Sequence, residues 1–169
     1  MPVLQWALTC NRVVTDTETN SVSYIDALEA FAVSSFPIPF PPICVSTLWR
    51  REREEDTLHA RVRIQDPAGQ TILSVEPDSP IPLTKKRHRL NVILGGPEIH
   101  GPGEYLIIVE QRAGKTAKVW KQEHVLPIDV THFTPVQQQK RKPKEEKRRP
   151  DATKALRQRH TAVAASRRR

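Results

Sequence analysis

The residues with the clearest potential for chemistry are cations gathered near the C-terminal end of the chain. Residues 137–169 hold 13 of the 27 Lys and Arg side chains and only three of the 19 Asp and Glu, whereas residues 1–136 hold 14 Lys and Arg against 16 Asp and Glu. The net charge is therefore +10 in the last segment and −2 before it. Because a Lys or Arg that meets a phosphate releases a condensed counterion, such a segment favours salt-sensitive binding to a polyanion.

Apolar side chains are almost absent from this cationic segment. Residues 137–169 contain one Leu, one Val and no aromatic side chain, which is too little apolar surface to offset the entropy lost on folding. We therefore expect the isolated segment to be disordered. Residues 151–165 begin with Asp, a good N-cap, and continue with Ala, Leu, Gln and Arg, so they are predicted to become helical on a partner.

We predict that this tail, residues 133–169, binds nucleic acid largely without sequence specificity, the partner being RNA or a nucleoprotein particle. The predicted contacts are its thirteen Lys and Arg side chains: Lys140, Arg141, Lys142, Lys144, Lys147, Arg148, Arg149, Lys154, Arg157, Arg159, Arg167, Arg168 and Arg169. The alternatives are a solubilising extension and an electrostatic arm for an acidic protein or a membrane.

A second group of cations lies in the N-terminal part of the chain. Residues 85–89 read KKRHR at the entrance to a predicted strand, and Arg61 and Arg63 alternate outward on another. Together they could line a second phosphate-binding patch on one sheet face. Its members would be Arg61, Arg63, Lys85, Lys86, Arg87 and Arg89. The alternative is a solvated strand edge whose charges discourage aggregation.

Catalytic and metal-binding patterns are weak in this sequence. Four histidines occur singly, without a second ligand at metal spacing: His88, His100, His124 and His132. Residues 95–103 have the glycines of a loop but neither the Lys-Ser/Thr pair nor the following helix of a phosphate-binding loop. We therefore predict a protein that is not an enzyme, has no catalytic residues and holds no metal or cofactor. The alternative is a hydrolase whose residues converge only in space.

Acidic loops leave calcium binding as another alternative. Asp16 and Glu18 share one loop, Asp78 lies in a second, and four carboxylates stand in a third over residues 52–56. Carboxylate oxygens are ligands of Ca²⁺, but the third loop is mostly Glu, contains Arg53 and lacks a DxD pattern. Solvated loops are therefore the preferred interpretation.

The element expected to organise the fold is the segment GPGEYLIIVE, residues 101–110. A Gly-Pro turn leads into the longest run of strand-forming residues in the chain, with apolar side chains on both faces. Both faces should therefore be covered, as in a central strand. Tyr105 follows the turn at the start of this strand, which predicts a tyrosine corner, in which the phenol bonds to backbone a few residues upstream.

Seven other segments have the length and pattern of strands. The clearest is TLHARVRIQ, residues 57–65, in which apolar and polar side chains alternate as in an antiparallel strand with one face in water. The others are residues 3–9, 21–28, 43–49, 70–76, 88–96 and 116–128. The run that begins at residue 21 also fits a helix, with Ile25, Leu28 and Ala32 on one face; we favour a strand over 21–28, followed by irregular chain, because Ser, Val, Tyr and Ile lead it. Prolines in residues 36–42 and 77–82 predict crossovers between strands.

These patterns predict an all-β fold, an antiparallel β-sandwich of about seven to nine strands over residues 1–132. The basic tail, residues 133–169, would follow it, disordered or conditionally helical. The side chains predicted to supply core are Trp6, Tyr24, Trp49, Val62, Leu90, Tyr105, Ile107 and Trp120.

The cysteines and the N-terminal sequence bear on cellular location. Cys10 and Cys44 are too few for a disulfide framework, and neither has a partner at zinc-ligand spacing. The first residues lack the basic start of a signal peptide, and no apolar run reaches the roughly 20 residues of a membrane span. We therefore expect a reduced, cytoplasmic protein without a membrane span.

Three groups of residues carry a resemblance to a known family. They are the opening strand that runs into Cys10-Asn11, the crossover from Phe36-Pro37 to Pro42 that enters Cys44-Val45, and the strand from Gly101 to Val109 with the later pairs Val119-Trp120 and Leu126-Pro127. Over residues 1 to about 130 the chain resembles a family of uncharacterised bacterial single-domain β-sandwich proteins, a domain of unknown function with C2-like or immunoglobulin-like architecture. The basic tail lies outside the family pattern.

The resemblance implies a fold and no activity. Combined with the cationic tail, it leads us to predict a non-enzymatic binding or scaffold module that meets nucleic acid through the tail and an unknown protein through the sandwich. A C2-like module that binds protein, or calcium and lipid, is the alternative that the resemblance leaves open.

Overall fold

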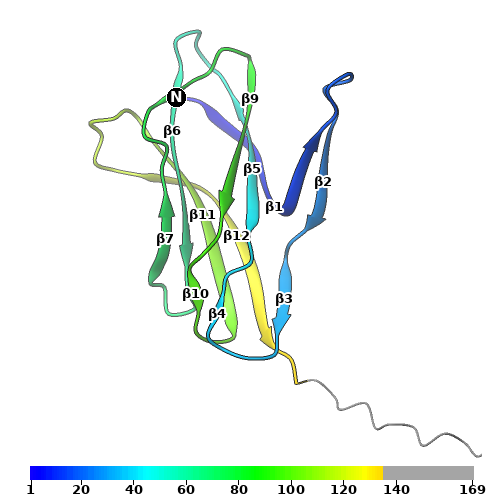
Figure 1. The fold of residues 1–169 in the computed structure, drawn as a ribbon. Helices are drawn as coiled ribbons and strands as arrows, with labels where there is room; N and C mark the ends of the chain where they lie inside the picture. Colours follow the sequence, from blue (N-terminus) through cyan, green and yellow to red (C-terminus); the bar gives the residue numbers. More distant parts are fainter. Residues whose placement is uncertain (135–169) are drawn as a thin grey trace, which may run out of the picture. The chain divides into compact units, whose positions relative to one another are not determined.

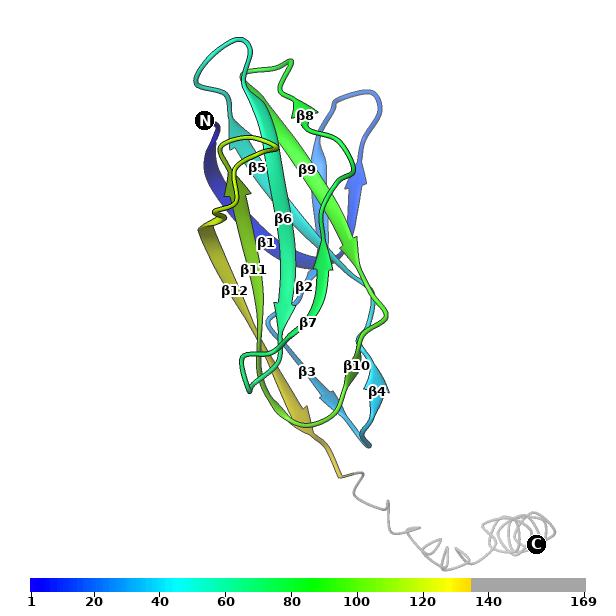
Figure 2. The same ribbon diagram turned by 90° about the vertical axis from the view of Figure 1, so that its left-hand side faces the viewer.

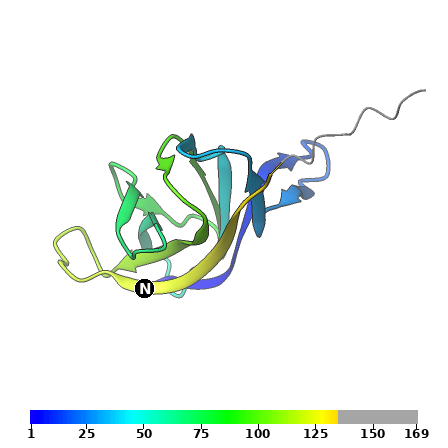
Figure 3. The ribbon, with the colours of Figure 1, turned by 90° about the horizontal axis from the view of Figure 1, so that it is seen from below.

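The structure, a computed structural model, describes residues 1–134, in which two larger sheets face each other (Figure 1, Figure 2, Figure 3). One has the order β2 (Val22–Ala27), β1 (Val3–Thr15), β5 (Ile43–Arg50), β9 (Arg87–Leu94). The other has the order β3 (Ala30–Val33), β12 (Lys121–His132), β11 (Gly103–Arg112), β6 (Thr57–Gln65), β7 (Thr71–Val75), with β8 (Ile81–Pro82) also paired to β6. A separate two-stranded ladder joins β4 (Ile38–Pro39) and β10 (Glu98–Ile99). We call residues 1–134 the body.

The two larger sheets bury one apolar core between them. Trp49 comes from β5 in the four-stranded sheet, and Ile64 and Ile107 come from β6 and β11 in the other; all three are fully buried. Every second side chain of β6, from Leu58 to Ile64, is buried, which confirms the alternation predicted for this strand. Each large apolar side chain buried in this way contributes about 1.5–3 kcal/mol to folding.

The strand β11 is central in the larger sheet, as predicted from its apolar sequence. It lies between β12 and β6, and both of its faces are covered: Ile107 faces the core, and Ile108 on the opposite face is also buried. Gly103 at its start has a φ of +140°, and a Cβ there would come within 2.6 Å of the Pro67 side chain. The turn that leads into β11 therefore requires glycine.

The prediction of an all-β fold is confirmed, but the strand number and the purely antiparallel character are wrong. The body has 12 strands in three sheets, where about seven to nine strands were predicted. Parts of the proline-containing crossovers, residues 36–42 and 77–82, pair locally as β4 and β8. β3 pairs in parallel with β12, because residues 30–33, predicted to be irregular, lie along the end of the last strand. No helix in the described residues is long and apolar enough to cross a membrane.

The phenol of Tyr105 makes the hydrogen bond predicted for a tyrosine corner. Its hydroxyl donates to the backbone carbonyl of Gly101, four residues upstream, at 3.0 Å. The ring is buried and packs against Phe40 with ring centroids 6.3 Å apart. The bond ties the turn before β11 to the core.

Replacing Tyr105 with Phe (Tyr105→Phe) is expected to lower the free energy of unfolding by about 1 kcal/mol, because one hydrogen bond is lost while the ring packing is kept. The measurement is urea unfolding followed by circular dichroism. Tyr24→Phe is the matched control, since the Tyr24 hydroxyl is buried without a hydrogen-bond partner in the described residues, and its removal should not destabilise the protein. An unchanged unfolding midpoint for Tyr105→Phe would show that the corner contributes nothing.

The strand β1 bends near Cys10, and its second half no longer pairs with β5. Up to Cys10 it pairs with β5, whereas from Arg12 to Thr15 it pairs with β2 alone. Residues 11–26, which we call the hairpin arm, consequently stand apart from β5 and β9 (Figure 1). The sequence predicted a first strand that ends at residue 9, so it missed the arm.

Three aromatic side chains predicted to supply core lie outside it. A register shift between Leu4 and Trp6 turns Trp6 away from the core side of β1, where it packs edge to face on Tyr24 of the arm with centroids 5.6 Å apart. Trp120 precedes β12, which starts at Lys121 and not at residue 116 as predicted. The other predicted side chains lie in the core or against it: Trp49, Val62, Leu90, Tyr105 and Ile107.

The fold brings Cys10 and Cys44 to directly opposite positions on β1 and β5. Both are free thiols and both are buried. Burial raises the pKa of Cys10 and raises the pKa of Cys44 to about 11. Because thiolates are then scarce at neutral pH, the pair has the properties of structural residues and not of nucleophiles.

Candidate nucleic-acid interface

The thirteen cations predicted to bind nucleic acid, from Lys140 to Arg169, lie outside the residues that the structure describes. The described chain that leads to them is well held. β12 pairs with β3 through to His132, and the backbone N–H of Phe133 donates to the carbonyl of Val33 at 2.7 Å. Neighbouring strands therefore fix the backbone as far as Phe133.

Arg61 and Arg63, two members of the predicted second patch, bind an internal carboxylate. Both project from β6 toward Glu110 of β11. Nε of Arg61 donates to Oε2 of Glu110 at 2.7 Å, and Arg63 donates to both carboxylate oxygens, from Nε at 2.8 Å and from a terminal nitrogen at 2.9 Å. The Glu110 side chain is only 6% exposed. Much of the positive charge of the two arginines is therefore neutralised within the body.

The environment of Glu110 keeps this cluster ionised. Burial of the carboxyl opposes its charged form, but the hydrogen bonds from Arg63 and Arg61 outweigh burial and hold the pKa of Glu110 below its ordinary value. The hydrogen bond to Glu110 likewise raises the pKa of Arg63. Such a cluster is costly to break, because removal of one partner leaves a buried charge without compensation.

Trp120 covers part of the same outer face. Its ring centre lies 4.2 Å from the guanidinium carbon of Arg61 and 4.6 Å from that of Arg112. Arg112 is in addition ion-paired with Glu76. Cation–π contacts of this kind contribute about 0.5–2 kcal/mol. Two arginines thus hold the loop before β12 against the sheet.

Sequence reasoning missed Glu110, Trp120 and Arg112 as members of this cluster. The available signal was weak: Glu110 is the one charged side chain that follows directly on the apolar run of β11. Its partners on β6 lie 47 and 49 residues away, so only the register of β11 on β6 reveals the contact.

The other members of the predicted second patch lie on the opposite sheet. Arg87 and Arg89 alternate with half-buried residues on β9, Lys85 and Lys86 precede it, and all four are exposed. β9 belongs to the four-stranded sheet and β6 to the larger one, so their outer faces point in opposite directions. The structure therefore does not bring Arg61 and Arg63 together with residues 85–89. Alternation along a strand predicts which side chains point outward, but it does not predict to which of the two sheets the strand belongs.

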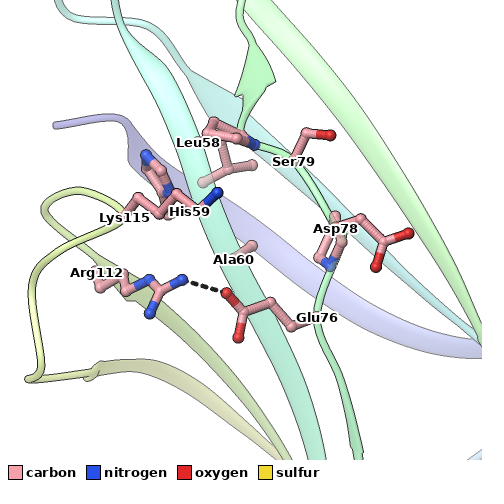
Figure 4. Close-up of a pocket in the computed structure, with 10 residues that line it drawn as sticks. Leu58, His59, Ala60, Glu76, Asp78, Ser79, Arg112 and Lys115 are labelled. Carbon is pink, nitrogen blue, oxygen red and sulfur yellow. Dashed lines mark hydrogen bonds and ion pairs between the residues drawn. The ribbon is translucent and has the colours of Figure 1, made fainter.

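A pocket opens at the edge of the larger sheet, beside β6 (Figure 4). β8 pairs with β6 at Leu58 and β7 pairs with it from Val62 onward, while residues 76–80, EPDSP, leave the ladder between these points. The two prolines of that segment lack the backbone donor that a ladder requires. The pocket has a volume of about 290 Å³, and Arg112 and Glu76, which line it, are paired with each other.

This pocket contains the residue types of a hydrolase without their arrangement. His59 and Ser79 both line it, but within residues 1–134 no hydrogen bond joins them. Ser79 and Asp78 carry their oxygens away from His59 (Figure 4). A nucleophile and a base are therefore not paired here, and the predicted lack of enzyme activity stays a prediction.

The acidic loops considered for calcium use their Asp side chains locally. Asp16 accepts hydrogen bonds from two backbone N–H groups of its own loop at 2.9 and 2.7 Å, and Asp56 accepts two at 2.8 and 2.9 Å. The hydrogen bond from the backbone N–H of Thr19 is the main cause that lowers the pKa of Asp16. The hydrogen bond from the backbone N–H of Arg53 is the main cause that lowers the pKa of Asp56. In the part of the chain that the structure describes, no group of three or more His, Cys, Asp or Glu side chains is placed to hold a metal ion.

Comparison with known proteins identifies a family without an assigned activity. Residues 5–116 match a family described as a family of unknown function, DUF6941. The matched segment includes the hairpin arm, β9 and the Glu110 cluster of arginines, whereas Trp120 and the tail lie beyond it. No curated protein matches the chain.

Proposed function

The chain belongs to this family of unknown function, DUF6941, and we propose that it is a non-enzymatic binding or scaffold module whose tail binds nucleic acid, RNA or a nucleoprotein particle, largely without sequence specificity. The observation that carries the proposal is the division of charge between the two parts of the chain. Residues 137–169 hold 13 Lys and Arg against three Asp and Glu, whereas residues 1–136 hold 14 against 16. A polyanion would therefore be attracted mainly by the tail.

Ion pairs within the body strengthen this division. Arg61 and Arg63 share Glu110, Arg112 pairs with Glu76, and two further pairs join Arg50 to Glu52 and Lys121 to Glu123. Each pair removes much of a positive charge from the field that an approaching phosphate would meet. The tail is therefore the main candidate for an electrostatic anchor.

We further infer a sandwich architecture of the C2-like or immunoglobulin-like kind for the body. Its support is the packing of two sheets on one core together with the bond from Tyr105 to Gly101, which is a tyrosine corner by position and geometry. A reducing, cytoplasmic location is also part of the proposal, supported by the free thiols of Cys10 and Cys44.

Removal of the tail is expected to abolish most binding to nucleic acid. The measurement compares the full chain with a chain that ends at Val136, using fluorescence anisotropy of labelled single-stranded RNA and duplex DNA at about 100 mM salt. Circular dichroism of both chains verifies that the sheets are intact. Equal affinity of the two chains would refute a tail-based anchor, and binding by neither would make an acidic protein the better candidate partner.

A further inference from the structure

A groove runs between the hairpin arm and the start of β9. Thr15 and Asn20 of the arm form one side, Leu48 of β5 lies at the floor, and the entry to β9 forms the other side. Its volume is about 550 Å³. The ribbon of the arm stands apart from β5 and β9 in Figure 1.

The β9 side of the groove is cationic. Lys85, Arg87 and Arg89 line it and are exposed. Within residues 1–134 none of these three side chains forms an ion pair, because the ion pairs there are made by other cations. Their positive charges are therefore not neutralised by a neighbouring carboxylate. They differ in this respect from Arg61 and Arg63.

The residues that line the opposite side of the groove are polar and uncharged. Thr15 and Asn20 offer a hydroxyl and an amide, and Thr84 adds a second hydroxyl beside Lys85. Two carboxylates stand in the turn between Thr15 and Asn20, those of Asp16 and Glu18, and neither lines the groove; Asp16 accepts hydrogen bonds from backbone N–H groups of its own turn. A phosphate in the groove would therefore meet donors on both sides.

We propose that this groove binds one strand of a phosphodiester backbone, as a second contact site for the nucleic acid that the tail attracts. The inference rests on the proposed function and extends it by giving the body a site of its own. Three cations along one side and hydroxyl or amide donors along the other match the contacts that proteins make to phosphates.

The composition of the groove also indicates how the strand is recognised. Its lining includes Leu48 and the ring of His88 but no Trp, Tyr or Phe, the side chains on which proteins usually stack bases. Contacts to phosphates orient a nucleic acid without reading its sequence. The groove therefore holds the backbone and leaves the bases free.

The test uses the full chain carrying Arg87→Gln and Arg89→Gln together. Affinity for a short fluorescein-labelled single-stranded RNA is measured by anisotropy over a range of salt concentrations. Losing two phosphate contacts on a single strand should reduce the slope of log affinity against log salt by about 1.4 and weaken binding roughly ten- to a hundredfold at about 100 mM salt. Unfolding midpoints should be unchanged, since neither side chain makes an ion pair in the described residues.

The matched control is the full chain with Lys115→Gln and Lys118→Gln, an equal loss of charge at two exposed side chains of the loop after β11. Its slope should stay near that of the unchanged protein. Equal slopes for all three proteins, or equal reductions in both variants, would overturn the groove as a site while leaving tail-dependent binding intact. Failure of the unchanged protein to bind RNA would instead refute the proposed function, and the groove site with it.

Discussion

Raising the salt concentration from about 50 to about 200 mM is expected to weaken binding of RNA or duplex DNA by the full chain by roughly 10³ to 10⁵. The expected size follows from counterion release, if about 6 to 10 of the tail cations meet phosphates. Residues 137–169 offer 13 such cations. Because phosphates carry no sequence information, unrelated sequences of equal length should bind equally well.

The measurement is a series of anisotropy titrations at several salt concentrations, with RNA and duplex DNA of several sequences. The chain ending at Val136 is the control, and its slope should be much shallower. Circular dichroism of the full chain should show a gain of helix on binding, from residues 151–165. A steep dependence on sequence combined with a shallow dependence on salt would contradict an electrostatic tail and point to base recognition.

Replacing Glu110 with Ala (Glu110→Ala) is expected to lower the free energy of unfolding by about 3–5 kcal/mol, the cost of breaking a buried ion pair. The substitution leaves the guanidinium groups of Arg61 and Arg63 facing each other without the carboxylate that both contact at 2.7 to 2.9 Å. Glu104→Ala, on the same strand but exposed and without an ion pair in the described residues, should change stability by less than about 0.5 kcal/mol. Urea unfolding followed by circular dichroism measures both.

The pH dependence of this effect has a defined sign. The pKa of Glu110 is lowered in the folded protein from the ordinary value of 4.5, so its contribution to stability is fully present above that value and is lost as the pH falls through the lowered pKa. The stability difference between the unchanged protein and Glu110→Gln should therefore be constant near neutral pH and shrink in acid. A difference that grows as the pH falls would mean that Glu110 is not held as a carboxylate.

Local patterns in the sequence predict local structure well in this chain. The alternation in residues 57–65 and the apolar run after Gly101 each depend on side chains within a few positions, and each is present in the structure. The bend of β1 and the parallel pairing of β3 were missed. Both arise from contacts with strands distant in the sequence, which no local periodicity encodes.

The candidate site shows the same limit more sharply. The sequence predicts that the cations of residues 85–89 and of β6 point outward. Whether each of them contacts a carboxylate or stays available to a phosphate depends on the register in which its strand pairs with the neighbouring strands. Glu110 reaches Arg61 and Arg63 only because β11 pairs with β6, and Arg87 borders a groove only because the arm folds beside β9. The charge of the tail, in contrast, depends on composition alone and needs no register.

The position of the last strand, β12, between β3 and β11 has a mechanical consequence. From Asp129 to Val130, β12 is hydrogen-bonded to β11 on one side and to β3 on the other, and its pairing with β3 continues to His132. A tensile load applied beyond His132 along the axis of β12 would have to shear two ladders together before the strand could peel away. Strand ends that are tied down in this way resist fraying. A tether that pulls at this point would therefore transmit force to the whole sheet and would not unravel it from its edge.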